Sequence, residues 1–206
     1  MPLGDQALLV RFGDRLSEAA NIAAIGFAAR AEAAGLPGVV EVVPNLVSVL
    51  LRYEPSAVDF ARLSGEVRLL GFGETDSVAT AREHRVGVAF DGEDLAEVAA
   101  LLGLEQEAFV VAHNSALLRV LSTGFAPGFV YCGMHAEALA VARRSSVRRQ
   151  VPAGTVLFAA GQTAITSTPI PTGWHVIGQT AFRNFDPGAA VPSPVRAGDL
   201  IRFEVG

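Results

Sequence analysis

The sequence predicts an α+β protein of two domains, with residues 1–80 in the first and residues 81–206 in the second. The first 70 residues alternate apolar runs with helical patterns in the order β-α-β-β-α, which predicts a small ferredoxin-like layer of two helices on a sheet. Residues 71–77 are small and polar and are the best candidate for a linker. After residue 117, short strands separated by glycine and proline predict a closed or nearly closed β-barrel.

The first domain opens with an apolar strand, residues 7–12, which ends at a Gly-Asp turn. Ser17 is a suitable N-cap for a helix that runs towards Gly35, because its hydroxyl can accept a hydrogen bond from an early helical N–H group. The buried stripe of this helix is expected to hold Ile22, Ile25 and Ala29.

Three further segments complete this domain. Residues 39–43 are strongly β-branched, and residues 46–53 follow a Pro-Asn turn, so the two segments predict a hairpin. A second helix is expected to start at residues 55–56. Within the linker, Gly71-x-Gly73 lacks the third glycine and the preceding strand of a phosphate-binding loop, so it does not indicate such a loop.

The second domain begins with a strand and two short helices. The strand covers residues 86–90, and the helices, over residues 95–102 and 105–112, are divided by a glycine. A helical pattern recurs at residues 136–141. Further strands are expected at 117–121, 155–159, 175–178 and 200–205, the last after an Ala-Gly-Asp hairpin turn.

Composition excludes several classes of protein. Half of the 206 residues are hydrophobic, enough for a sizeable core, yet no apolar run approaches the roughly 18 residues that span a membrane. The amino terminus lacks a signal-peptide pattern, and the single cysteine, Cys132, permits no internal disulfide, so we expect a cytoplasmic protein. A net charge of −5 argues against a general nucleic-acid binder.

Common catalytic motifs are absent or incomplete. Residues 135–137 match half of a zinc-deaminase signature, but its two-cysteine half is missing, and the sequence holds no zinc-protease, Walker or nucleophile-elbow motif. No metal site is therefore expected. Cys132 could act as a nucleophile with His113, His135 or His175 as its base, but a lone cysteine in an apolar stretch is more often a buried hydrophobe.

Candidate binding residues gather between residues 124 and 180. Glycine and proline are dense there, and aromatic and arginine side chains are interleaved with them. One or two of the four arginines at positions 143–149 could hold a carboxylate or phosphate, and the others would form a solvated face. His113 is expected either to cap a helix end or to belong to the site, and Trp174 either to pack in the core or to wall a pocket.

Motifs in this region resemble those of one bacterial family. GFAPGFVY at residues 124–131 resembles the G-F-x-P-G-F-x-Y signature of the KipI/PxpB family, which includes the B subunits of 5-oxoprolinases and is also called allophanate hydrolase subunit 1 or a carboxyltransferase domain. RRQVPAGTV at 148–156, GQT at 161–163 and GWHVIGQT at 173–180 are similar to further family motifs in the same order. His113 and two amino-terminal segments also match, so the resemblance covers nearly the whole chain.

The resemblance implies a small α+β domain followed in the chain by a cyclophilin-like β-barrel, and it implies partner subunits. A KipA/PxpC-like subunit and a PxpA-like subunit are expected to join this chain in a complex that opens 5-oxo-L-proline to L-glutamate, driven by ATP. Phosphorylation of the carbonyl oxygen would make hydrolysis of an unstrained lactam feasible. Arginines and backbone N–H groups near a Gly-rich loop would suit the resulting anion. Whether ATP touches this chain stays open.

Two other functions are open within the family. One is a non-catalytic regulatory protein of the KipI type, which inhibits a histidine kinase, and the other is a carboxyltransferase or allophanate hydrolase-type subunit of urea degradation. Thr166, Thr172 and Gln179 stand where the family has Tyr, Gly and Arg, and the loss of the tyrosine and the arginine favours the regulatory alternative. Thr172 also tolerates a positive φ poorly.

The matched motif positions predict one pocket for a small amide or lactam substrate. Aromatic side chains are expected to line it and polar ones to lie nearby, and the catalytic groups are left unassigned. The expected residues are His113, Phe125, Pro127, Phe129, Tyr131, Arg148, Gln162, Thr163, Trp174 and Thr180.

Overall fold

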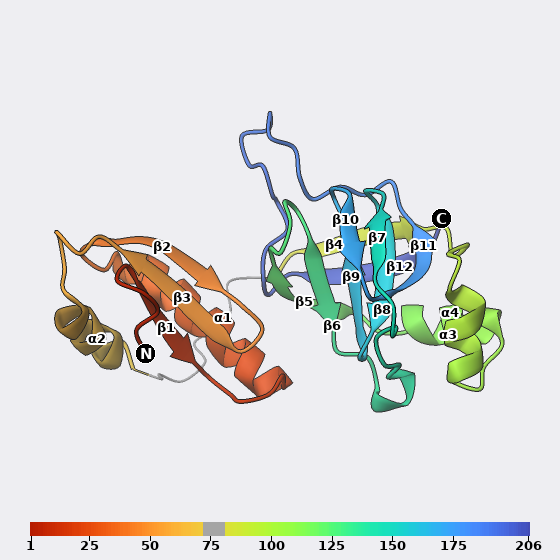
Figure 1. Ribbon diagram of the computed structural model, residues 1–206, viewed down its shortest axis with the longest axis horizontal. Coiled ribbons are helices and arrows are strands. Elements are labelled where there is room, and N and C mark those ends of the chain that lie inside the picture. Colours follow the sequence, from red (N-terminus) through yellow and green to blue (C-terminus); the bar gives the residue numbers. More distant parts are fainter. Residues whose placement is uncertain (72–80) are drawn as a thin grey trace. The chain divides into compact units, whose positions relative to one another are not determined.

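The computed structural model of the protein describes residues 1–71 and 81–206 (Figure 1). The expected linker, apart from Gly71, and the Gly71-x-Gly73 element lie outside the described residues. The chain divides into two compact units, Met1–Ala81 and Arg82–Gly206. In the part of the chain that the structure describes, no helix is both long and apolar enough to cross a membrane.

The first unit is a three-stranded antiparallel sheet with two helices. Its strands are β1 (Ala7–Arg11), β2 (Val39–Pro44) and β3 (Ser48–Tyr53), in the order β1-β3-β2, and its helices are α1 (Glu18–Ala34) and α2 (Phe60–Leu69). The strands β2 and β3 form the expected hairpin. A complete ferredoxin-like unit would add a fourth strand, and residues 1–71 contain none.

Helix α1 begins and ends where its caps predict. The Ser17 hydroxyl accepts a hydrogen bond of 3.2 Å from the Ala20 N–H group, and Gly35 ends the helix with a φ of 56°. The expected buried stripe is wrong in part, because Ala29 is exposed and Ile22 only half-buried. Alanine lies on every side of this helix, so packing on the sheet selects the buried face, which holds Ala24, Phe27, Ala28 and Ala31.

Helix α2 starts later than the expected residues 55–56. Residues 54–58 form a separate turn in which the Glu54 carbonyl accepts two hydrogen bonds. Asp59 then caps the helix, because its carboxylate accepts a 2.8 Å hydrogen bond from the Arg62 N–H group. The capping residue therefore decides the start.

The second unit is built on one curled sheet. Backbone hydrogen bonds in both directions between Ala89 and Gln179 link its two edges, so the sheet curls round an interior. Its seven strands lie in the order β11-β8-β9-β6-β5-β12-β4 (Figure 1). They are β4 (Glu83–Val88), β5 (Leu118–Thr123), β6 (Val130–Gly133), β8 (Thr155–Ala159), β9 (Gln162–Ile165), β11 (His175–Gln179) and β12 (Leu200–Val205).

Smaller elements surround this sheet. The strands β7 (Arg148–Val151) and β10 (Ile170–Thr172) form a separate antiparallel pair, and helices α3 (Leu95–Leu101) and α4 (Gln106–Asn114) contact β11 and β12. The expected helix over 136–141 is a single 3-10 turn, η1 (Glu137–Leu139). The expected final hairpin is also wrong, because β12 pairs with β5 and, in parallel, with β4.

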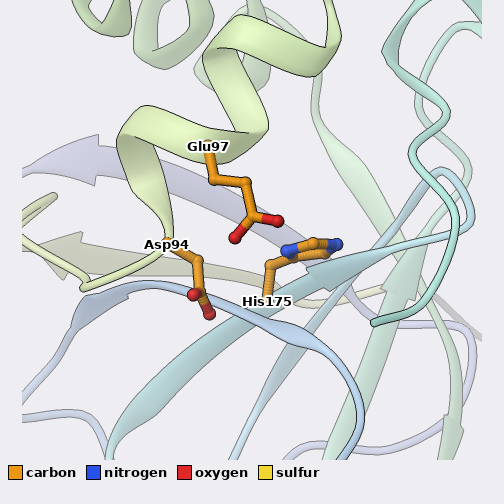
Figure 2. Close-up of side chains that lie close together, drawn as sticks. All are labelled: Asp94, Glu97 and His175. Carbon is orange, nitrogen blue, oxygen red and sulfur yellow. The ribbon is translucent and has the colours of Figure 1, made fainter. Parts of the chain in front are cut away.

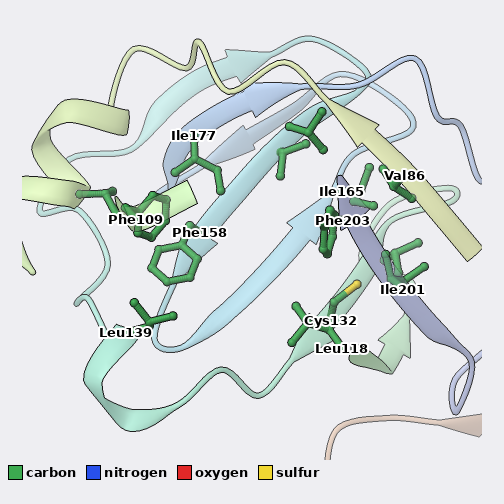
Figure 3. Packing of buried hydrophobic residues seen from close by; sticks show 14 of the residues in the cluster. Val86, Phe109, Leu118, Cys132, Leu139, Phe158, Ile165, Ile177, Ile201 and Phe203 are labelled. Carbon is green, nitrogen blue, oxygen red and sulfur yellow. The ribbon is translucent and has the colours of Figure 1, made fainter. Parts of the chain in front are cut away.

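Side-chain alternation gives the curled sheet two apolar faces. The inner face holds the larger cluster, in which Phe109 of α4 and Leu139 of η1 join strand residues such as Phe158 and Ile177 (Figure 3). The outer face is covered in part by the β7–β10 pair. Its cluster consists of Phe129, Val151, Leu157, Ala159, Ala164, Ile170, Trp174 and Val176, with Ala126 and Tyr131 packed against it.

Candidate functional site

Two histidines meet on the inner face of the curled sheet. His113, at the end of α4, and His135, after β6, have ring centroids 4.7 Å apart. The Nε2 atom of each ring lies 2.8 Å from Thr163 Oγ1 on β9. Thr163 points inwards, since its neighbours across β6 and β8, Cys132 and Phe158, both belong to the inner cluster.

The hydrogen bonds assign one tautomer to each ring. His113 Nδ1 lies 2.7 Å from Asn114 Oδ1. An amide oxygen only accepts, so Nδ1 carries the proton of His113, and its Nε2 lone pair accepts from the Thr163 hydroxyl. The Nε2–H group of His135 must then donate to the Thr163 oxygen. His113, Thr163 and His135 thus form a directed chain, which we call the histidine relay.

The apolar interior keeps these groups uncharged. Burial lowers the pKa of His113 to about 4, although the bond to Asn114 raises it. Burial, together with the neighbouring His113, lowers the pKa of His135 to about 3, so both rings are neutral at pH 7. Complete burial raises the pKa of the Cys132 thiol, which therefore stays protonated and is unsuited to act as a nucleophile.

Asp94, directly before α3, is the centre of an ion-pair network, and its side chain is only 4% exposed. Arg148 donates to both carboxylate oxygens at 2.7 Å, Arg144 donates to Oδ1 at 2.6 Å, and the Val176 N–H group donates to Oδ2 at 2.7 Å. Burial alone would raise the pKa of Asp94. The bonds from Arg148 and Val176 and the charges of the two arginines outweigh it, so the pKa lies below its ordinary value.

Asp94, Glu97 and His175 also bring one potential metal ligand each within 4.8 Å of one another (Figure 2). Each oxygen of Asp94 already accepts two hydrogen bonds, and Arg144 bonds Glu97 at 3.2 Å as well. Two guanidinium groups against one carboxylate disfavour a further cation there. His175 Nε2 donates to the Ala142 carbonyl at 3.0 Å. Asp94 and His175 therefore bind backbone groups, the Val176 N–H group and the Ala142 carbonyl, and are poorly suited to ligating a metal ion.

Four aromatic rings form a continuous row along the outer face. The ring centroids are 5.5 Å apart for Phe125 and Phe129, 4.6 Å for Phe129 and Tyr131, and 6.0 Å for Tyr131 and Trp174. Phe125 is 71% exposed and has a φ of 78°, an unusual conformation for a bulky residue. We call these four residues the aromatic row. The guanidinium carbon of Arg143 lies 5.6 Å from the Trp174 ring centroid.

The structure divides the expected pocket residues between several places. The aromatic row and Gln162 lie on the outer face, whereas His113 and Thr163 lie on the inner face. Arg148 is occupied by Asp94 and Glu93. Elsewhere, Pro127 is exposed in the loop before β6, and the Thr180 hydroxyl donates to the Gly87 carbonyl at 2.6 Å.

Two departures from the family pattern touch the same residue. Thr166 Oγ1 accepts a 3.0 Å hydrogen bond from the Thr155 N–H group, and the Gln179 amide donates to Thr155 Oγ1 at 2.9 Å. The positions of the missing tyrosine and arginine are thus joined through one residue, by its backbone N–H group and its hydroxyl. Thr172 needs no positive φ, since only Phe125 and Ala160 show one among the described non-glycine residues. Its hydroxyl instead accepts from the Trp174 N–H group at 3.0 Å.

The pattern-based reasoning did not include Asp94, the centre of the ion-pair network, or His135, one end of the histidine relay, among the candidate site residues. His135 entered only as a possible base for Cys132 and as part of the incomplete zinc-deaminase match, and Asp94 did not enter at all. Asp94 precedes an apolar helical pattern, which is a helix-start signal, but nothing in the sequence pairs it with arginines about 50 residues away. The position of His135 depends on how residues 134–147 fold over the sheet, which local pattern does not specify.

A small mixed unit followed by a curled sheet is the architecture of a carboxyltransferase-type domain. The urea carboxylase of Kluyveromyces lactis has this fold: the match has a TM-score of 0.73 at 13% identity and covers 98% of this chain and 21% of that one. The chain belongs to the family described as carboxyltransferase domain, subdomain C and D, whose model matches residues 1–195.

Closer relatives share this family. The chain is 32% identical to the B subunit of 5-oxoprolinase from Bacillus subtilis over 98% of this chain and 90% of that one. It is 38% identical to the B subunit of 5-oxoprolinase from Escherichia coli O157:H7 over 82% of this chain and 78% of that one. The crystal structure of TTHA0988 matches 98% of this chain with a TM-score of 0.86 and 35% identity. The match spans only 40% of that longer chain.

Proposed function

We propose that this chain is the B subunit of an ATP-dependent 5-oxoprolinase-type complex, which converts 5-oxo-L-proline to L-glutamate. The observation that carries the proposal is the 32% identity to the B subunit of a 5-oxoprolinase along nearly the full length of both chains. A KipA/PxpC-like subunit and a PxpA-like subunit complete the complex. We place the complex in the cytoplasm, for which a chain with a single cysteine is suited.

Partners are supported by the larger chains in which this fold occurs. The matched region is 40% of TTHA0988 and 21% of the yeast urea carboxylase. The described residues also offer no thiolate nucleophile, because the buried Cys132 thiol stays protonated. We therefore propose that this chain is inactive alone, and that ATP is used by the assembled complex.

We assign the second unit to the cyclophilin-like barrels and the first to the ferredoxin-like units. The bridge between Ala89 and Gln179, which links the edges of the curled sheet, supports the first assignment. The strand order β1-β3-β2, with α1 connecting β1 to β2, supports the second and corresponds to a ferredoxin-like sheet without its fourth strand.

The regulatory alternative of the KipI type is favoured by one observation. Thr166 and Gln179 replace the tyrosine and the arginine of the family pattern, yet both are built into a hydrogen-bonded network around Thr155. Loss of the usual charged side chain at Gln179, with the fold kept, would suit inhibition of a histidine kinase better than turnover. The urea-degrading alternative follows from the family match and would require a biotin carboxylase and a biotin carrier.

Reconstitution discriminates among these functions. This chain would be co-purified with its C-type and A-type partners, and glutamate release from 5-oxo-L-proline would be measured with and without ATP. The 5-oxoprolinase function predicts ATP-dependent glutamate only when all three subunits are present. No turnover by the complete complex would refute it, and lowered autophosphorylation of a cognate histidine kinase would then support the regulatory function.

A further inference from the structure

The four arginines at positions 143–149 fall into two groups. Arg144 and Arg148 are held by Asp94 and acidic neighbours, with side chains only 21% and 19% exposed. Arg143 and Arg149 are exposed, and neither forms an ion pair with a carboxylate of residues 1–71 or 81–206. Of these two, Arg143 alone is placed over an aromatic ring, that of Trp174.

The position of Arg143 is set by its neighbours in the chain. The Ala142 carbonyl accepts the hydrogen bond from His175 Nε2 at 3.0 Å, and the Arg144 N–H group donates to the Gly173 carbonyl at 2.9 Å. Residues 142–144 therefore run beside residues 173–175. The exposed side chain of Arg143 lies over Trp174, and its charge opposes the rise that burial causes in the pKa of the Tyr131 phenol.

A polar atom without a partner lies on the same face. Gln162 is paired with Ala159 of β8 and Gly133 of β6, and two residues further along β9 Ala164 is paired with Tyr131. Alternation therefore places Gln162 and Tyr131 together on the outer face. Gln162 is 7% exposed, and its Oε1 atom is buried without a hydrogen-bond partner. Such an orphaned acceptor destabilises the free protein, and a ligand N–H group would satisfy it.

We propose that Arg143, Trp174, Tyr131 and Gln162 form a binding site for a small carboxylate that carries an amide N–H group. Arg143 binds the carboxylate through its planar fork, and the aromatic rings contact the apolar body of the ligand. A rotation of the Gln162 amide lets Oε1 accept from the ligand N–H group, and Gly133 opposite leaves room for it. Resting on the proposed function, this site assigns the 5-oxo-L-proline substrate to this subunit, since that lactam has both groups on one ring.

The sequence contains a single tryptophan, so its fluorescence reports directly on the site. Titration of the full chain with 5-oxo-L-proline should change Trp174 emission saturably, and equilibrium dialysis with labelled ligand should give the same dissociation constant. Cyclopentanecarboxylate, which lacks the amide, should bind more weakly, and 2-pyrrolidinone, which lacks the carboxylate, should not compete. Arg143→Gln should weaken binding about ten- to a hundredfold, the range expected for loss of a charged hydrogen bond.

Arg149→Gln is the matched control, because it removes another exposed arginine of the same segment and should leave the dissociation constant unchanged. Circular dichroism would confirm that both variants fold. Absence of binding in the dialysis, or equal weakening by the two variants, would overturn the site. The two proposals fail in different ways. Turnover by the complex without binding of 5-oxo-L-proline to this chain would refute only the binding site. Binding without turnover would refute only the 5-oxoprolinase function.

Discussion

Asp94→Asn should destabilise the second unit more than any other single change in its ion-pair network. The substitution keeps the shape of the side chain but leaves Arg144 and Arg148 without their shared charge. Removal of one partner from a buried ion pair costs about 3–5 kcal/mol, and the partial exposure of both arginines points to the lower end, about 3 kcal/mol. For a chain of this length, that loss corresponds to a fall in Tm of roughly 6–12 °C.

Urea unfolding followed by Trp174 fluorescence measures this loss in the second unit, because Trp174 lies two residues before Val176, which Asp94 holds. Glu97→Gln is the control: that carboxylate is 55% exposed, so the change should cost less than about 1 kcal/mol. A loss below about 1 kcal/mol for Asp94→Asn, or an equal loss for both variants, would refute the reasoning.

The lowered pKa of Asp94 also gives the sign of the pH dependence. A carboxyl whose pKa is lower in the folded state stabilises the fold above its ordinary value of 3.8, and this contribution is lost as the pH falls through the folded value. The difference between the native chain and Asp94→Asn should therefore be complete at pH 7. It should shrink below pH 3.8.

Three further predictions concern the histidine relay and the loop before β6. Thr163→Val should lower the free energy of unfolding by about 1–3 kcal/mol in urea titrations, because it removes the hydroxyl that bonds both histidines. Thr163→Ser keeps that hydroxyl and should cost much less. The free energy of unfolding should fall as the pH drops from the ordinary histidine pKa of 6.5 towards 4, because His113 and His135 bind protons in the unfolded chain but stay neutral when buried. A flat stability profile from pH 7.5 to 4.5 would contradict this. Both glycines of the loop have positive φ, but an added Cβ at Gly128 would lie 2.6 Å from a neighbouring side chain, whereas at Gly124 it meets nothing within 4 Å. Thermal unfolding should therefore show Gly128→Ala to be about 1–3 kcal/mol worse than Gly124→Ala, and equal losses would show that backbone strain alone matters.

Local chemistry accounts for the elements that the sequence predicts well. Ser17 and Gly35 cap α1 through their own hydrogen bonds and backbone angles, and the hairpin of β2 and β3 needs only its turn and two β-branched segments. The strands β6, β7, β9 and β10 were not predicted. Each has three or four residues, too few to show a period, and their hydrogen bonds go to strands elsewhere in the chain.

The candidate site shows the same limit. The motif positions predict the residues of the aromatic row, whose rings contact one another in the structure, and the arginines at positions 143–149. Asp94 pairs with Arg144 and Arg148 and leaves the other two arginines of this group exposed. The sequence does not show this pairing, because Asp94 lies about 50 residues before the arginines. The two faces of the sheet separate His113 from Trp174, a distinction that requires the register of β6, β8 and β9.

The place of β12 constrains how the second unit can be made. This strand lies between β5 and β4, and its parallel partner β4 is more than 100 residues earlier in the chain. Until Leu200–Val205 leave the ribosome, β4 and β5 both have an unpaired edge, and His113 lacks the cover of Phe203. The sheet therefore closes only after synthesis of this unit is nearly complete. Open strand edges invite aggregation in the meantime. A partner or chaperone that binds the nascent chain would act in this interval.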